Sequence, residues 1–342
     1  MSDGKEKATY IVGLLIGVVI YLLIFIYIYK GNLGQFIKIV TRGSPESVVL
    51  AYVARVGYLI CEAMIWWAIL RIFGKVSVIK VWEVMFAAIF VEFVLPVGGA
   101  TEVARYLLAV KLKLTDREGA AASIFAHRLI NTLAILLTTF ISLIIIQAPF
   151  PLYLGLGIPS LILVGGNAAL YLLPKYKWVE EYADKFLRRV SMSIEGMSEN
   201  YRFRMNQIKR SYRLIALAFL FAFLERLASG IYGIEVAGIT GIDISLPKAL
   251  LAFDSLYTIM WLLPALTPGG IGIFEFIQTG LLTYLGIGMD SAATISIVSR
   301  IYYVLGEYPL FLLSALGLGY SGKELIKQLI RSRQKAEEST AT

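Results

Sequence analysis

Four charged residues stand inside apolar stretches of the sequence at matched spacing. Glu102 lies 26 residues before Arg128, and Glu275 lies 25 residues before Arg300. Because an Arg at the centre of a membrane helix costs about 2.5–3.5 kcal/mol to insert, such residues face the protein interior, a water-filled cavity or each other. Guanidinium groups bind phosphate through paired hydrogen bonds, and the glutamates would balance that charge, carry a proton or meet a cationic headgroup. The alternative is that two buried Glu–Arg pairs hold neighbouring segments together.

Each glutamate follows a break rich in proline and glycine. The break residues are Pro96, Gly98, Gly99, Pro268, Gly269 and Gly270. Proline removes an amide donor, and glycine makes a tight chain reversal inexpensive. Broken helices expose amides that hold anions, so we expect a bend with a binding site. The alternative is a bend alone.

Further polar residues interrupt the apolar stretches. They are Glu62, Glu225, Arg226 and Asp254. Glu62 and Glu225 precede the two interrupted stretches, and each is predicted to be a packing partner for an intramembrane arginine; the alternative is that they carry a coupling proton. Asp254 is a further supporting or proton-coupling candidate. His127 is predicted to be a helix histidine with satisfied hydrogen bonds, although it would also serve a proton relay.

The composition excludes most classes of soluble protein. Of 342 residues, 58% are hydrophobic and 16% charged, and the mean hydropathy is +0.73. A soluble domain carries about 25% charge, so the excess apolar surface must face lipid. A single Cys and a single His exclude an internal disulfide and a Cys/His zinc cluster. We expect no metal, no cofactor and no catalytic residue, and we attribute the net charge of +8 to loops near anionic lipid heads rather than to nucleic-acid binding.

The sequence predicts an all-α polytopic membrane protein with about six spans and two re-entrant hairpins. The spans are expected at 10–29, 49–72, 119–147, 152–173, 212–239 and 291–319. The interrupted stretches 81–111 and 248–286 are kinked spans or hairpins. Ten Lys/Arg in 174–213 and five in 321–342 place both segments in the cytoplasm. With this topology, 81–111 enters and leaves on the cytoplasmic face and 248–286 on the outer face.

These features define one membrane domain, 1–342, with an internal repeat. Its parts are an anchor helix (10–29), repeat one (49–147), a connecting span (152–173), a basic cytoplasmic linker helix (174–211), repeat two (212–319) and a cytoplasmic tail (320–342). The topology gives the repeats opposite orientation. Inverted repeats with broken helices recur in transporters, and the substrate site then lies between the copies.

The paired blocks resemble the flippase-like transmembrane family, which includes the N-terminal translocating domain of lysylphosphatidylglycerol synthases. The blocks are LPVGGATEVARYLLAVKLKLTDREGAAASIFAHR and LTPGGIGIFEFIQTGLLTYLGIGMDSAATISIVSR, and the resemblance covers about 49–319. It implies transfer of a lipid between leaflets, with Glu102, Arg128, Glu275 and Arg300 along the lipid path. The 23 residues after the last span leave no room for an aminoacyl-transferring domain, so synthase activity is not implied.

The expected function is flipping or scrambling of a phospholipid or polyprenyl-phosphate-type lipid. A secondary transporter of a small polar anion and an integral-membrane transferase acting on a lipid carrier are the alternatives. Without an ATP-binding motif, movement must run downhill or use an ion gradient. The partners are expected to be membrane lipids with anionic headgroups, and assembly into homo-oligomers stays open. We expect a multi-pass protein of the cytoplasmic membrane with both termini in the cytoplasm.

Overall fold

The structure, a computed structural model, describes residues 44–94, 100–172, 198–262 and 272–318, together with Gly34 and Gly270. All regular elements of these ranges are helical. Four helices are long and apolar enough to cross a membrane: α3 (Pro45–Leu70), α6 (Arg117–Ile145), α11 (Tyr212–Ile239) and the continuous run Phe150–Ala168. They coincide with the predicted spans 49–72, 119–147, 212–239 and 152–173. The predicted anchor, 10–29, lies outside the described residues.

Local sequence explains where two of these helices begin. The Ser44 side chain accepts a hydrogen bond from the Glu46 amide, and Pro45 takes the first helical position of α3. Asp116 caps α6 by accepting from the Gly119 amide at 2.7 Å. Such side chains satisfy amides that have no partner within the helix, and a proline at the first position loses none.

Each interrupted stretch contains helices on both sides of its Pro-Gly break. In the first, α4 (Val78–Val94) packs against α5 (Ala100–Lys111). The second contains α12 (Leu246–Leu250), the π-helical turn η3 (Leu251–Ser255), α13 (Leu256–Leu262) and α14 (Ile273–Tyr284). The breaks themselves, with Pro96, Gly98, Gly99, Pro268 and Gly269, lie outside the described residues. Re-entry on one membrane face therefore stays a prediction.

The remaining helices close the bundle. After Ala148 the chain forms α7 (Phe150–Leu152), the π-helical turn η1 (Tyr153–Gly157) and α8 (Ile158–Leu172). The predicted span 291–319 corresponds to α15 (Met289–Ile301), the π-helical η5 (Tyr302–Glu307) and α16 (Tyr308–Gly317). Of the predicted linker, the structure describes α10 (Ser198–Arg210), and the tail 320–342 lies outside it.

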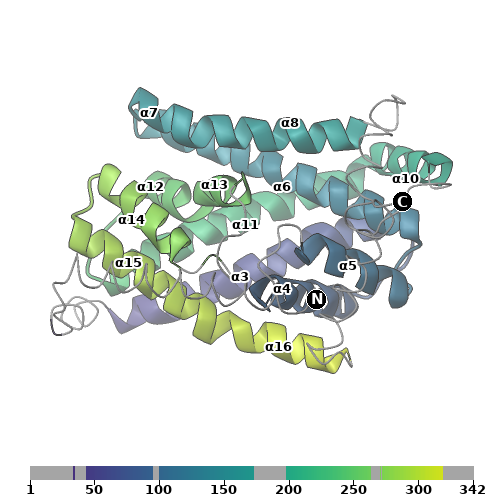
Figure 1. Cartoon of the computed structure of the whole chain (residues 1–342), viewed down its shortest axis with the longest axis horizontal. Coiled ribbons are helices and arrows are strands. Elements are labelled where there is room, and N and C mark those ends of the chain that lie inside the picture. The colour runs from purple at the N-terminus through teal and green to yellow at the C-terminus, as the bar shows by residue number, and fades with distance from the viewer. Residues whose placement is uncertain are drawn as a thin grey trace, which may run out of the picture.

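Helices α3 and α11 form the centre of the molecule, and the other helices pack around them (Figure 1). α8 lies along α6, α16 along α4, and α14 beside α15. α11 approaches α12 and η3 closely, because a Cβ on Gly233 would stand 2.6 Å from a ring carbon of Phe253. Apolar side chains such as Ile144 and Ile162 remain exposed on the outer helices, as lipid contact requires.

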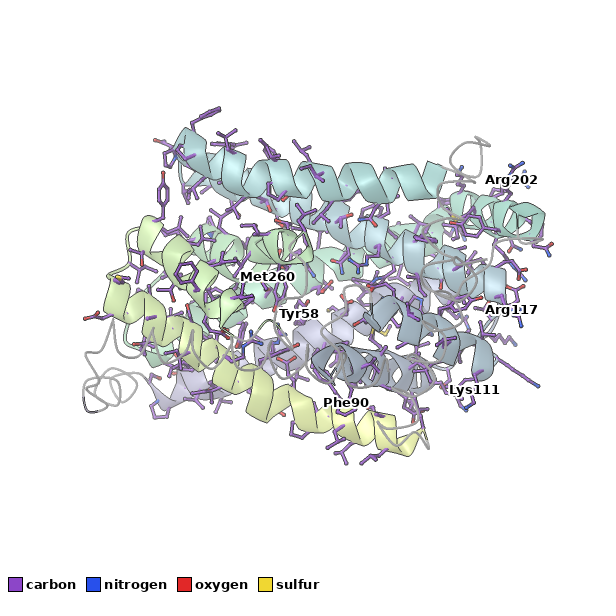
Figure 2. All side chains as sticks on the ribbon, viewed as in Figure 1. Tyr58, Phe90, Lys111, Arg117, Arg202 and Met260 are labelled. Atoms are coloured by element: carbon purple, nitrogen blue, oxygen red, sulfur yellow. The ribbon has the colours of Figure 1, made fainter. Side chains whose placement is uncertain are left out.

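Basic residues gather at one end of the bundle. Lys111, Arg117 and Arg202 lie at the end where α10 packs against α6 (Figure 2). There Arg204 of α10 donates to Asp116 from Nε at 3.1 Å and also from Nη2. An excess of Lys and Arg marks the cytoplasmic side of membrane proteins, and this end is the one the sequence analysis assigns to the cytoplasm.

Candidate functional site

Both Glu–Arg sets found in the sequence form ion pairs. Arg128 Nη2 contacts Glu102 Oε1, and Arg300 Nε contacts Glu275 Oε1. Each glutamate is the third residue of the helix that follows a break, in α5 and in α14. Each arginine is the twelfth residue of its helix, in α6 and in α15. The repeated order in the sequence therefore corresponds to repeated positions in the helices.

Glu275 of the second pair, Glu275–Arg300, also caps the N-terminus of α14. Glu275 Oε2 accepts a hydrogen bond from the Gly272 amide at 2.6 Å, while Oε1 faces Arg300. Gly270 and Gly272 have φ of 69° and 85°, in the left-handed region that favours glycine. A Cβ on Gly270 would stand 3.1 Å from Met260 Cε and 4.0 Å from Arg300 Nη2. The glycine thus lets the backbone pass close to the ion pair.

The two pairs differ in their access to solvent or lipid. The side chains of Arg128 and Glu102 are 25% and 24% exposed, whereas those of Arg300 and Glu275 are 9% and 0% exposed. In a partly exposed pair, one partner can be replaced by another charged group at a lower free-energy cost than in a buried pair. The cost is lower because the charged groups lose less contact with water. The first pair is therefore the more accessible of the two.

A second group of charges lies between α3, α11 and η3. Arg226 donates from Nη1 to Asp254 Oδ1 at 2.7 Å and contacts Glu225 Oε1 through Nη2. Glu225 and Asp254 therefore both contact the same buried arginine. Tyr58, near the middle of the molecule in Figure 2, places its ring 5.7 Å from the Arg226 guanidinium carbon.

Glu62 and His127 meet next to this group. Glu62 Oε2 accepts from Asn131 at 3.0 Å, and Glu62 Oε1 lies 3.5 Å from His127 Nε2. His127 Nδ1 lies 3.3 Å from Arg105 Nη1. Both ring nitrogens of the histidine are thus engaged, as predicted for a helix histidine with satisfied hydrogen bonds. Asn131 and His127 are thus two of the polar neighbours of Glu62.

Sequence reasoning missed several charged residues of the interior. Arg55 of α3 forms a bidentate pair with Glu307 of η5, donating from Nε and from Nη2 at 3.1 Å. Arg105 is 2% exposed, and its guanidinium stacks on Trp66 at 4.3 Å. Arg55, Glu307 and Arg105 each stand in an apolar stretch of the sequence, which indicates a buried charge. They were missed because none of them belongs to the repeated motif.

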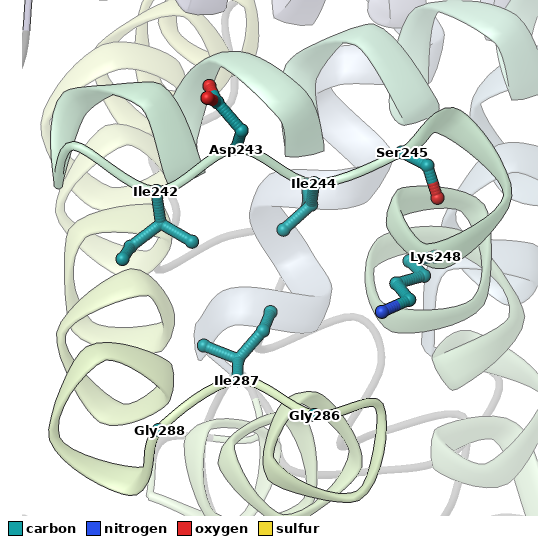
Figure 3. A pocket seen from close by; sticks show the side chains of 8 residues that line it. All are labelled: Ile242, Asp243, Ile244, Ser245, Lys248, Gly286, Ile287 and Gly288. Carbon is teal, nitrogen blue, oxygen red and sulfur yellow. The ribbon is translucent and has the colours of Figure 1, made fainter.

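The structure also contains a cavity of about 310 Å³ away from these charges. Two loops line it, 242–245 after α11 and 286–288 after α14 (Figure 3). Lys248 at its edge donates to the Leu285 carbonyl at 2.8 Å, and Asp243 points away from the space between the loops. Within the described ranges, no group of three His, Cys, Asp or Glu residues is arranged to hold a metal ion.

A bundle of apolar helices with charged pairs enclosed inside it defines a polytopic membrane protein. The chain belongs to the family of the lysylphosphatidylglycerol synthase TM region, which it matches over residues 10–308. It is also 24% identical over 325 residues to a UPF0104 membrane protein of Methanothermobacter thermautotrophicus, covering 88% of this chain and 91% of that relative. The family resemblance inferred from the paired blocks is therefore confirmed. The protein is a multi-pass membrane protein, and its family is consistent with a lipid-related function.

Proposed function

We propose that the protein moves a phospholipid or polyprenyl-phosphate-type lipid between membrane leaflets, with the headgroup passing the two Glu–Arg pairs. The observation that carries the proposal is the partly exposed Glu102–Arg128 pair beside the first helix break. A lipid phosphate competes with Glu102 for the Arg128 guanidinium, because both are oxyanions that the planar fork binds. A cationic headgroup amine would in turn meet the released glutamate.

The second pair supports a stepwise path. Glu275–Arg300 occupies the matching helix positions in the other half of the chain but is buried. In alternating access, one half opens while the other is closed. The exposed and the buried pair correspond to an open and a closed end of such a path. The acyl chains would stay in the surrounding lipid while the headgroup moves.

Leaflet exchange of a labelled phospholipid in proteoliposomes tests the proposal. We expect exchange with the wild type and none with the double variant Arg128→Ala/Arg300→Ala. Arg71→Ala serves as the matched control, because Arg71 is exposed beyond the end of α3 and outside both pairs. All proteins must first give matching monodisperse gel-filtration profiles.

Arg128→Lys separates geometry from charge. Lysine keeps the positive charge but lacks the planar fork, so a phosphate clamp predicts loss of exchange in a folded protein. Normal exchange by this variant would contradict the clamp. An absence of wild-type exchange with anionic, zwitterionic and polyprenyl-phosphate lipids would favour transport of a small polar anion, which the enclosed Glu275–Arg300 pair would suit.

A further inference from the structure

A chain of ionisable side chains crosses the middle of the bundle. It runs, contact by contact, through Arg105, His127, Glu62, Glu225, Arg226 and Asp254. Five of these residues are at most 2% exposed, and the Glu62 side chain is 16% exposed. The chain starts on α5 and ends on η3, so it links the helices at the two breaks through α6, α3 and α11.

The histidine in this chain is held in its neutral form by geometry. A guanidinium has only donors, so the contact of Arg105 Nη1 with His127 Nδ1 requires that Nδ1 accept. The proton of the neutral ring is then on Nε2. This nitrogen lies 3.4 Å from the backbone carbonyl oxygen of Glu62 and 3.5 Å from Glu62 Oε1. A second ring proton would point at the N–H groups of Arg105. His127 is therefore not the place for an additional proton.

The two glutamates meet directly. The carboxyl groups of Glu62 and Glu225 lie within hydrogen-bonding reach of each other. Ionised carboxylates only accept hydrogen bonds, and two of them in contact repel strongly away from water. Glu62 already accepts from Asn131, and Glu225 Oε1 already contacts Arg226. Both oxygens of the buried Glu225 carboxylate lack a hydrogen-bond donor among the described residues. A proton on Glu225 gives this carboxyl group an O–H that can donate to Glu62.

The local charge balance also requires one proton. Two guanidinium groups, those of Arg105 and Arg226, face three acids: Glu62, Glu225 and Asp254. With all three acids ionised, this group would carry one uncompensated negative charge inside the bundle, which is expensive in a low-dielectric environment. The remaining neighbours do not compensate it.

Those neighbours are paired or uncharged. Arg55 of α3 also faces Asp254, but Arg55 and Glu307 of η5 neutralise each other. Glu102 and Arg128 face the cluster from α5 and α6 and neutralise each other. Tyr58 and Cys61 of α3 also face it, and both are uncharged in their ordinary protonated forms.

We propose that the Glu62–Glu225 contact is a proton-binding site, and that lipid movement is coupled to loading and release of this proton. A proton from water adds to the Glu225 carboxylate, whose O–H then donates to Glu62, and release returns the proton to water with no other bond changed. The coupling part rests on the proposed lipid transport. It assigns a proton gradient as the energy source that the sequence left open.

Infrared spectroscopy of the protein in lipid nanodiscs tests the site without any transport. We expect a protonated-carboxyl C=O band in the wild type near neutral pH that shifts in deuterated buffer. Glu225→Gln and Glu62→Gln should each remove it. Glu235→Gln is the matched control, because Glu235 is a half-buried glutamate of the same helix α11 outside the contact chain. A wild type without the band, or a band that persists in both variants, would overturn the proton site.

Proteoliposomes with an imposed pH gradient test the coupling. For one proton per lipid, a gradient of one pH unit supports a steady-state leaflet asymmetry of the labelled lipid of up to about tenfold. We expect this asymmetry with the wild type and with Glu235→Gln, and equal leaflet distributions with Glu225→Gln.

The outcomes of these experiments distinguish the proton-binding site from its coupling to lipid movement. Wild-type exchange that ends with equal leaflets despite the gradient would overturn the coupling while leaving lipid transport in place. A complete absence of exchange would overturn the proposed function and the coupling with it, and the infrared band still decides the proton site independently.

Discussion

At the scale of single residues, the two Glu–Arg pairs have the same chemistry but different surroundings. Glu102–Arg128 is open on one side, whereas Glu275–Arg300 is enclosed and shares its glutamate with the backbone amide of Gly272. Removing one partner of a buried pair leaves an uncompensated charge, and this typically costs about 3–5 kcal/mol. Partly exposed pairs contribute much less, because water screens the charge that is left.

Arg300→Ala should therefore lower the thermal stability of the protein in detergent more than Arg128→Ala. The reason is that the first variant leaves Glu275 charged and fully buried, while the second leaves Glu102 accessible. Fluorescence-monitored unfolding of both variants and the wild type measures the difference. Equal losses would mean that the two environments are alike, contrary to the exposure of the side chains.

The sequence indicated these two pairs because it contains the motif twice. A single Glu and Arg 26 residues apart would mean little, but the same order in a second copy gave an independent observation. Arg55 and Glu307 lie 252 residues apart and occur once, so no spacing within the chain connects them. Their contact depends on how α3 packs against η5, which only the folded structure provides.

At the scale of elements, the contact between α10 and α6 combines apolar packing of Met205 and Ile208 with an ion pair at its end. Asp116 caps α6 through the Gly119 amide and receives two hydrogen bonds from Arg204. Partial burial alone would raise the pKa of Asp116, but these hydrogen bonds and the Arg204 charge outweigh it, so the pKa lies below its ordinary value. The ionised carboxylate is therefore the form that stabilises the folded protein.

Asp116→Ala should lower the melting temperature at neutral pH, because removing a helix cap typically costs about 1 kcal/mol. The pKa of Asp116 is depressed in the folded state, so its contribution is present above the unfolded value of about 3.9 and is lost as the pH falls through the folded value. The difference between wild type and variant should shrink on acidification below that range. A difference that is constant from neutral to strongly acidic pH would contradict this account.

Helix boundaries were predictable where composition alone decides them. The predicted span 212–239 coincides with α11, because an uninterrupted apolar run must be helical where the bilayer offers no hydrogen-bond partners. The π-helical turns η1, η3 and η5 were not foreseen. They depend on one extra residue in a turn, and no residue type in the sequence specifies that insertion.

At the scale of the whole molecule, the distribution of Lys and Arg predicts which loops face the cytoplasm. Lys209 and Asp243 lie on the two sides of α11 along the chain. In a Cys61→Ser background, the single variants Lys209→Cys and Asp243→Cys should therefore react with an impermeant maleimide from opposite sides of the membrane. Lys75 and Lys113 flank the α4–α5 pair. A re-entrant hairpin predicts that Lys75→Cys and Lys113→Cys both react from the same side of the membrane as Lys209→Cys. Labelling of Lys75 and Lys113 positions from opposite sides would establish a kinked span instead.

Two buried arginines take their carboxylate partners from π-helical turns: Asp254 lies in η3 and Glu307 in η5. A π turn holds one residue more than an α turn. Moving it along a helix rotates each residue that it passes by about 100° around the axis, while the backbone stays hydrogen-bonded. A shift of either π turn by one residue would therefore separate a carboxylate from its arginine inside the bundle while the helix keeps its backbone hydrogen bonds.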